Sequence, residues 1–424
     1  MTRDRWLLSA LSLGLALASP ATAWAGTGSG DIDDLLVDGK FTFDVRARYE
    51  EVSQEGNFPG GDAEAPTIRA RVGFLTGKVN GFQGLVEGVG VVHLSDHFND
   101  GVNGETQYPL VPDPSGVQLN RLQVEYTGFE GADIIVGRQR INLDNQRFVG
   151  AAAWRQLEQT YDALRIGYTG IDKLSLTYIY VDQVNRVFGD ESTKSEFDGP
   201  IHLFNIGYDY ALIGKIVGYA YLLDLSESNP VLDLTEARAQ STATWGLRVS
   251  GKKTIADGYA LGYEAEYAHQ NDYADNPNDV SLNYWHGDLA IMHSGFTLLG
   301  GFETLEGNGV VGFSTPLGTL HKFQGYADAF LTTPANGIVD IYGKLGYEIK
   351  FEEPVGPITG VTAAVWYHDF DAERGGASLG REFDLEAVAK LGDHFAVGTK
   401  YANLDGDGAV RDRHKTWFYV EANY

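Results

Sequence analysis

The sequence contains no cysteine in 424 residues and only two methionines. The absence of cysteine excludes disulfide bonds, thiolate metal sites and cysteine nucleophiles. Beyond the N-terminus no apolar run approaches about 18 residues, the length of a membrane-spanning helix, so we expect no transmembrane helix. Basic residues are also scarce, since 32 Lys and Arg stand against 58 Asp and Glu, for a formal net charge of −26. We expect no nucleic-acid partner for this chain.

Catalytic motifs are missing as well. The sequence has neither a GxSxG nor an HExxH motif. Four histidines, His93, His97, His269 and His286, are scattered without a convincing set of partners. We therefore predict that the protein is not an enzyme and has no catalytic residues, no cofactor and no metal site. The alternative is a hydrolase or acyltransferase site built from serine, histidine and an acid or amide.

The first 25 residues have the layout of a secretory signal peptide. Arg3 and Arg5 precede an apolar run, and the small residues Ala23 and Ala25 end it. We predict a signal peptide over residues 1–25 and a short periplasmic segment over 26–38. A single β domain over 39–424 follows, because no linker or low-complexity stretch divides the rest.

Most of the remaining chain alternates between apolar and polar residues. In the stretch FTFDVRARYE, residues 41–50, the aromatic and aliphatic side chains fall on one face and the charged ones on the other. The stretch TIRARVGF, residues 67–74, repeats the pattern, and so does the end of the chain, which finishes in Tyr424. This period of two predicts β-strands throughout.

The lengths of the strands and of their connections indicate a membrane barrel. Most expected strands have about 10–15 residues, longer than those of common globular sheets and long enough to cross a bilayer. Short connections are expected at 76–81, 128–132, 168–173, 211–215, 253–258, 293–295, 352–357 and 391–394. They alternate with long ones near 53–65, 97–116, 144–158, 187–199, 226–241, 272–278, 306–337, 371–379 and 406–413.

This rhythm is that of short periplasmic turns and long extracellular loops. We therefore predict an all-β fold, a transmembrane antiparallel β-barrel of about 18 strands in the outer membrane of a Gram-negative bacterium. Its surroundings would be outer-membrane lipid and lipopolysaccharide.

Arginines recur on the polar face of the first six expected strands. Because an arginine facing mid-bilayer lipid costs roughly 2–4 kcal/mol, we predict that they line the lumen. The predicted pore-lining, anion-binding set is Arg46, Arg48, Arg69, Arg71, Arg121, Arg138, Arg140 and Arg165. The predicted opposing acidic wall is Glu264, Glu266, Asp288, Glu382, Asp384 and Glu386. The alternative is that lumenal arginines and acids pair and neutralise one another.

Two long connections differ from the others. The first, residues 143–162, mixes Arg147, Trp154 and Arg155 with small residues. The second, 312–337, is rich in leucine and aromatics, and its Thr315-Pro316 pair predicts the start of a helix. We predict that both fold inward and constrict the pore, the alternative being surface loops packed on their neighbours.

These two blocks carry a family resemblance. The stretches GRQRINLDNQRFVGAAAWRQLEQTYDALRIGY and FSTPLGTLHKFQGYADAFLTTPANGIVDIYG resemble the signature stretches of the alginate export family of outer-membrane proteins. The resemblance implies an eighteen-stranded barrel with an arginine-rich, anion-selective lumen. The residues it carries over are Arg138 and Arg140, with Asn145, Arg147, Trp154, Arg155, His321 and Lys322 as constriction residues.

Together these features predict an outer-membrane channel for passive passage of anionic or polyhydroxylated solutes. An acidic polysaccharide or oligosaccharide of the alginate type is the favoured solute, and periplasmic secretion partners would supply it. A porin for small carboxylates or sugars is the main alternative, followed by a closed structural barrel.

Overall fold

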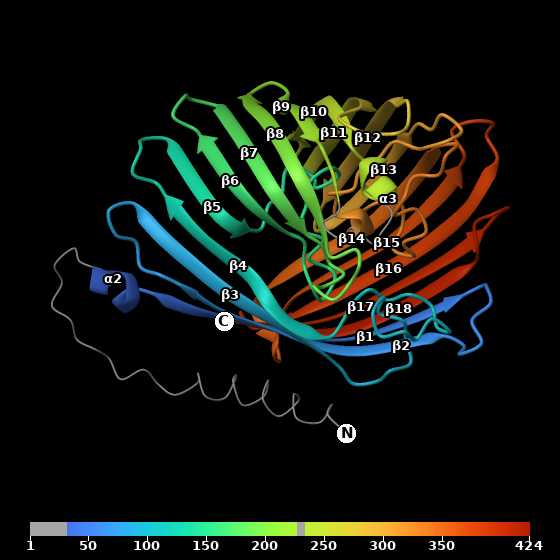
Figure 1. Ribbon diagram of the computed structural model, residues 1–424, viewed down its shortest axis with the longest axis horizontal. Helices are drawn as coiled ribbons and strands as arrows, with labels where there is room; N and C mark the ends of the chain where they lie inside the picture. Colours follow the sequence, from blue (N-terminus) through green and yellow to red (C-terminus); the bar gives the residue numbers. More distant parts are fainter. Residues whose placement is uncertain (1–31, 227–233) are drawn as a thin grey trace.

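The computed structural model describes residues 32–226 and 234–424. Its strands form one sheet in which each strand pairs antiparallel with the next, and β1 pairs with β18 to close the ring (Figure 1). The predicted antiparallel barrel is thus confirmed, with eighteen strands. Closure leaves no unpaired sheet edge, which a bilayer requires.

The strands are long, and several exceed a dozen residues. The first nine are β1 (Lys40–Gln54), β2 (Ala63–Leu75), β3 (Phe82–His93), β4 (Gly116–Tyr126), β5 (Ala132–Gln139), β6 (Thr160–Tyr168), β7 (Leu174–Asn185), β8 (Glu196–Tyr210) and β9 (Gly214–Leu223). The second nine are β10 (Thr242–Ala256), β11 (Tyr259–Asp272), β12 (Ser281–His293), β13 (Phe296–Leu305), β14 (Ile338–Val355), β15 (Ile358–Asp371), β16 (Ser378–Leu391), β17 (Phe395–Gly406) and β18 (Arg413–Asn423). Short turns and long loops alternate between them as predicted.

Within residues 32–226 and 234–424, helix is confined to short pieces. They are α2 (Ile32–Val37), α3 (Leu234–Arg238) and the 3-10 turn η1 (Leu320–Lys322). Among the described residues, no helix is long and apolar enough to cross a membrane. The expected signal peptide, 1–25, lies outside the described residues. Of the expected segment 26–38, the described part forms α2, whose Leu35 carbonyl accepts a hydrogen bond from the Gly77 amide at 2.8 Å.

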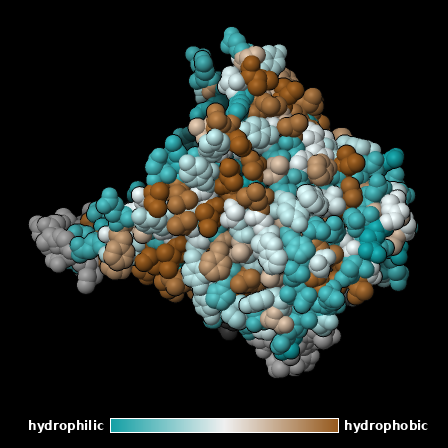
Figure 2. Space-filling model, turned by 90° about the horizontal axis from the view of Figure 1, so that it is seen from above, coloured by the Kyte–Doolittle hydropathy of each residue, from teal (hydrophilic) through white to brown (hydrophobic). Residues whose placement is uncertain are grey.

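The outer face of the barrel is apolar and is bordered by two bands of aromatic residues that run around the barrel. Exposed aromatics lie beside the short turns, at Phe82, Tyr168, Tyr210, Tyr259, Phe296 and Phe395. Others lie toward the opposite strand ends, at Trp245, Trp285 and Tyr367. Such bands are typical of the two membrane interfaces of an outer-membrane barrel. Figure 2 shows hydrophobic residues gathered toward one side of the face in view and hydrophilic residues toward the other.

Two loops fill the inside of the ring (Figure 1). We call residues 140–159, between β5 and β6, loop A, and residues 306–337, between β13 and β14, loop B. The loops are hydrogen-bonded to each other, for example from the Gly150 amide to the Leu317 carbonyl at 2.8 Å. Their apolar side chains form one buried core with the inner wall, including Phe148, Val149, Phe313 and Leu317. The predicted inward folding of both loops is therefore confirmed.

Loop B does not contain the predicted helix. After Thr315 it forms only the short turn η1. Gln324 and Asp328 have positive φ angles of 56° and 58°, and these left-handed positions interrupt any helix. The prediction was wrong because the loop is held by other contacts: the Thr319 amide binds the Gln146 carbonyl of loop A, and the amides of Tyr326 and Ala327 bind side chains of β16.

Candidate functional site

Four of the predicted arginines lie on β1 and β2 and are buried against loop A. They are Arg46, Arg48, Arg69 and Arg71. Arg46 and Arg69 are direct cross-strand neighbours. Like charges placed so close together are tolerated only when other groups stabilise them. The surroundings of each arginine therefore decide what it does.

Loop A supplies carbonyl oxygens to two of these arginines. The Nη2 of Arg46 donates to the carbonyls of Trp154 at 2.9 Å and Arg155 at 2.6 Å, and its Nε donates to the amide oxygen of Gln156 at 3.0 Å. Arg48 donates to the Trp154 carbonyl at 2.5 Å. The two guanidinium groups thus fix the inner end of loop A against the wall.

Carboxylates pair with the rest of this wall. Arg48 pairs with Asp113, and Arg69 with Asp44. Arg121 pairs with Glu87 at 2.6 Å. These three arginines are therefore paired with carboxylates, as the alternative of mutual neutralisation expects.

Glu158, at the end of loop A, is shared by two arginines. Its Oε2 lies 3.4 Å from Arg71 and 2.6 Å from Arg140. Burial alone would raise the pKa of Glu158, but the two arginines and their hydrogen bonds hold it below its ordinary value. Glu158 is therefore ionised at neutral pH.

Arg155 joins loop A to loop B and to the wall. Its guanidinium lies 3.2 Å from Glu50 on β1 and 3.4 Å from Asp328 in loop B. Lys415 on β18 lies 2.6 Å from the same Asp328 and 3.4 Å from Glu50. Burial opposes ionisation of Asp328, but His321, Lys415 and Arg155 together hold its pKa well below the ordinary value. This buried network fixes the two loops relative to each other.

His321 stacks on Trp154 in the same region. The rings are 5.2 Å apart and nearly parallel, at 3°. Burial lowers the pKa of His321 to about 4, although Asp328 opposes the shift. The neutral ring can donate from Nδ1 to Asp328, at 2.8 Å, and accept at Nε2 from Lys400, at 3.5 Å. Its neighbours thus fit a neutral imidazole of one tautomer.

Loop B is held by the predicted acidic wall. Glu382 and Asp384 on β16 accept hydrogen bonds from the amides of Ala327, at 2.6 Å, and Tyr326, at 3.1 Å. Glu386 accepts one from the Tyr326 hydroxyl at 3.0 Å. This part of the acidic wall anchors a loop by its N–H groups.

The other predicted acids lie on β11 and β12 beneath loop A. Asn145 donates to Glu264 at 2.8 Å. Oxygen and nitrogen atoms of Glu264, Glu266 and His286 lie within 4.8 Å of one another, the spacing of a cation site. Arg248 pairs with Glu264 and lies 3.8 Å from Glu266, so a guanidinium already supplies the positive charge there. Asp288 lies 3.7 Å from His286.

Arg138 is placed differently from the prediction. Its cross-strand neighbours are Leu122, which is exposed on the outer wall, and Asp162, with which it pairs at 2.7 Å. Arg138 therefore lies on the outer face, and the prediction that it lines the pore was wrong. Its two sequence neighbours, Gly137 and Gln139, occupy the inner face. On this short strand the charged residue therefore lies outside, and a glycine and a glutamine lie inside.

The remaining predicted residues are spread through the lumen. Arg165 on β6 lies on the inner face with Ala163 and 3.8 Å from Asp133. Arg147 is buried and pairs with Glu303 on β13 at 2.8 Å. Lys322 is exposed on loop B, with its Nζ 3.0 Å from the Asn145 carbonyl.

Several residues of this network escaped the sequence prediction. They are Glu50, Glu87, Asp113, Glu158, Arg248, Glu303, Asp328, Lys400 and Lys415. Glu50 continues the alternation of Arg46 and Arg48, so the period of two could have identified it. Asp113 and Asp328 stand in long loops, and no local pattern indicates them.

Comparison with known proteins bears on family and fold. The family model described as Alginate export matches residues 39–281. No curated protein matches the sequence. Among solved structures, the barrel is similar to OccAB2 of Acinetobacter baumannii, with 14% identity, a TM-score of 0.68, and coverage of 92% of this chain and 99% of that one. OpdK of Pseudomonas aeruginosa gives 13% identity, a TM-score of 0.68 and the same coverage. OccD3 of Pseudomonas aeruginosa gives 14% identity, a TM-score of 0.64 and coverage of 94% of each chain.

Proposed function

The chain belongs to the alginate export family and forms an outer-membrane channel, and from this premise we propose that it passes anionic or polyhydroxylated solutes by passive diffusion. An acidic oligosaccharide or polysaccharide of the alginate type is the favoured solute. It would cross the lumen through the passage that loops A and B narrow. The family and fold are those of passive channels rather than of enzymes.

The observation that carries this proposal is a set of three inner arginines that stay accessible although they are paired. The side chains of Arg121, Arg140 and Arg165 are 21%, 33% and 37% exposed. A guanidinium has five donors, so one carboxylate partner leaves others for a solute. Weak, repeated contacts of this kind permit movement from site to site, which conduction requires.

The buried arginines have another role in this proposal. Arg46 and Arg48 donate hydrogen bonds to carbonyl groups of loop A. Arg155 pairs with Glu50 and Asp328. They hold the constriction in place and do not meet the solute. The pathway is therefore lined by fewer arginines than the sequence suggests.

A porin for small carboxylates is the second candidate. The close packing of the two loops favours it, because Val149, Phe313 and Leu317 are almost fully buried between the loops and the wall. A rigid constriction suits single small molecules better than a long chain. The two candidates differ in the size of the solute and share its charge.

Planar-bilayer recordings of the purified protein test the proposal. The reversal potential in a salt gradient should show anion selectivity, and an oligouronate should interrupt the current. Arg140→Gln and Arg165→Gln should each reduce selectivity. Arg138→Gln is the matched control, because Arg138 lies on the outer face. Cation selectivity of the unaltered channel would contradict the proposal, and selectivity without oligouronate block would favour the small-solute porin.

A further inference from the structure

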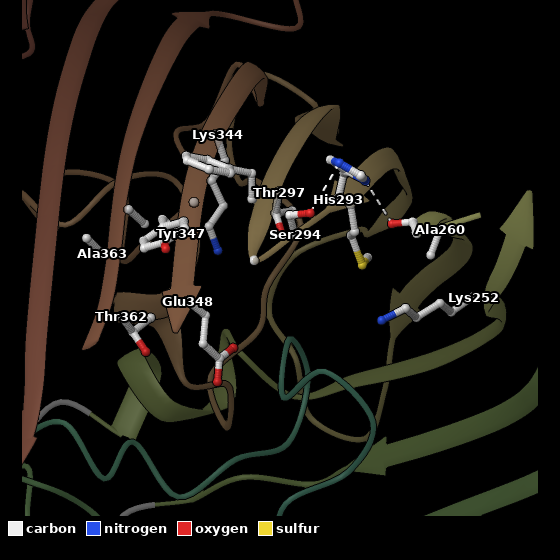
Figure 3. Close-up of a pocket in the computed structure, with 16 residues that line it drawn as sticks. Lys252, Ala260, His293, Ser294, Thr297, Lys344, Tyr347, Glu348, Thr362 and Ala363 are labelled. Atoms are coloured by element: carbon white, nitrogen blue, oxygen red, sulfur yellow. Dashed lines mark hydrogen bonds between the residues drawn. The ribbon is translucent and has the colours of Figure 1, made fainter. Parts of the chain in front are cut away.

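The inner wall has a hollow near the short turns between β10 and β15. Figure 3 shows it from the lumen side, with Lys252 and Lys344 entering from opposite sides. Its volume is about 420 Å³. This lies within the range of roughly 300–1,000 Å³ that small-molecule sites occupy.

The hollow exists because, apart from Met292, most inward residues between the two lysines are small. Ala260, Thr297, Gly346, Thr362 and Ala364 line it. These positions lie on the strands between and beside the two lysines, and each leaves room that a larger side chain would fill. The wall is thus recessed between two long basic side chains.

Both lysines face the lumen. Lys252 on β10 is four residues after Arg248, so the two side chains lie on the same face of the strand. Arg248 faces the lumen, where it contacts Glu264 beneath loop A. Lys344 lies on β14 two residues beyond Tyr342, whose hydroxyl is 2.9 Å from His286. Because alternate strand residues share a face, both ammonium groups belong to the inner wall.

These lysines differ from the arginines in lacking a carboxylate partner. In the parts of the chain that the structure describes, neither Lys252 nor Lys344 has a carboxylate within ion-pair distance. Lys344 instead lies 4.5 Å from the ring centre of Trp366. Glu348 is the one acid that lines the hollow, together with the hydroxyls of Thr297 and Thr362. The hollow therefore offers two ammonium groups outside ion-pair distance of a carboxylate, together with hydroxyls and one carboxylate.

From this arrangement we infer that the hollow is a binding subsite for a uronate unit of an acidic saccharide. The ammonium groups of Lys252 and Lys344 would bind carboxylates. Thr297, Thr362 and Glu348 would exchange hydrogen bonds with sugar hydroxyls. Lysine is a flexible point charge, so the contacts bind without locking one geometry. The inference rests on the proposed function. It places the first contact of a solute that enters from the short-turn end of the barrel on the wall opposite the arginines.

Block of single-channel current by trigalacturonate tests the subsite. The double variant Lys252→Gln/Lys344→Gln should weaken block by about tenfold or more, as loss of two charge-assisted contacts implies. Lys253→Gln is the matched control, because Lys253 is the next residue on the same strand but lies on the outer face. The Lys252→Arg/Lys344→Arg variant keeps both charges and should retain block within about threefold.

The outcomes separate this inference from the proposed function. Equal block of the unaltered channel, the double glutamine variant and the Lys253→Gln control would overturn the subsite and leave the channel function standing. An unaltered channel that trigalacturonate does not block at all would contradict both. Equal block by neutral maltotriose would overturn charge recognition. Glu348→Gln should strengthen trigalacturonate block, and weaker block there would also count against the subsite.

Discussion

Loops A and B occupy the same lumen but differ in the wall groups that bind their backbone, although Arg413 on β18 also donates to the carbonyls of Ala327 and Asp328 in loop B. Arg46 and Arg48 donate to the carbonyl oxygens of loop A, whereas Glu382 and Asp384 accept from the amide groups of loop B. A buried loop leaves its backbone N–H and C=O groups without water, and each needs a partner. Here guanidinium groups satisfy one kind and carboxylates the other.

This difference teaches that charge on an inner wall is not by itself a sign of a solute pathway. The arginines that cluster most tightly, on β1 and β2, are buried beneath loop A. Cations that stay accessible include Arg121, Arg140 and Arg165 and, on the nominally acidic side, Lys252 and Lys344. Exposure, and not the residue type, therefore separates the charges that anchor a loop from those that we propose bind solute.

Breaking the loop A anchor should have the largest effect. Arg48→Met removes a donor from the Trp154 carbonyl and leaves the buried Asp113 with the Gln156 amide and with Arg155, at 3.6 Å, as its one remaining ion-pair partner. We expect a loss of about 3–5 kcal/mol in unfolding free energy, because breaking a buried ion pair strands a charge. Urea unfolding in detergent measures it, and single-channel conductance should rise as loop A loosens. Arg165→Met, at a partly exposed pair, is the control. An equal loss there would contradict the distinction.

Acid should loosen the contact between the two loops. Because the pKa of His321 in the folded protein is about 4, below the ordinary value of 6.5, the folded state binds this proton less tightly than the unfolded chain. Stability is therefore full above about pH 6.5 and declines as the pH falls toward 4, by at most about 3 kcal/mol. Asp328 stays ionised over this window, because its pKa is held far lower.

The measurement is the urea midpoint and the open-channel noise between pH 4 and pH 8. In His321→Gln the part of the decline that begins near pH 6.5 should disappear. If the variant and the unaltered protein follow the same curve, His321 is not the group responsible.

The loop B anchor should be weaker to break. Glu382→Leu leaves the Ala327 amide without its acceptor, at an expected cost of about 1–3 kcal/mol. Glu382→Gln keeps an acceptor oxygen for this amide, so it should cost less. Hydrogen exchange of the Ala327 amide and unfolding in urea distinguish the pair. A greater loss for the glutamine variant would show that charge, and not the hydrogen bond, holds loop B.

Strand alternation and the spacing of the connections in the sequence predicted the barrel and its number of strands, about eighteen, whereas the inward course of both loops was predicted from their apolar and aromatic residues. The barrel prediction succeeded because period two and turn spacing are local properties that the bilayer enforces along every strand. Sequence prediction failed where partners come from distant loops. Glu158 and Asp328 meet Arg71 and Lys415 across the lumen, and no local pattern records those contacts. The helix expected in loop B failed for the same reason, since the Thr319 amide binds loop A and the amides of Tyr326 and Ala327 bind β16.

Arg138 shows a second limit, and its substitution should have the smallest effect. On the short strand β5 the residues before and after it, Gly137 and Gln139, face inward, so the arginine lies outside and pairs with Asp162. The pair is partly exposed, so Arg138→Gln should change the unfolding free energy by no more than about 1 kcal/mol. Anion selectivity should stay as it is, whereas Arg140→Gln, two residues along the chain, should reduce it. A loss of selectivity in Arg138→Gln as large as that in Arg140→Gln would place Arg138 in the solute pathway and overturn the assignment of the two faces of β5.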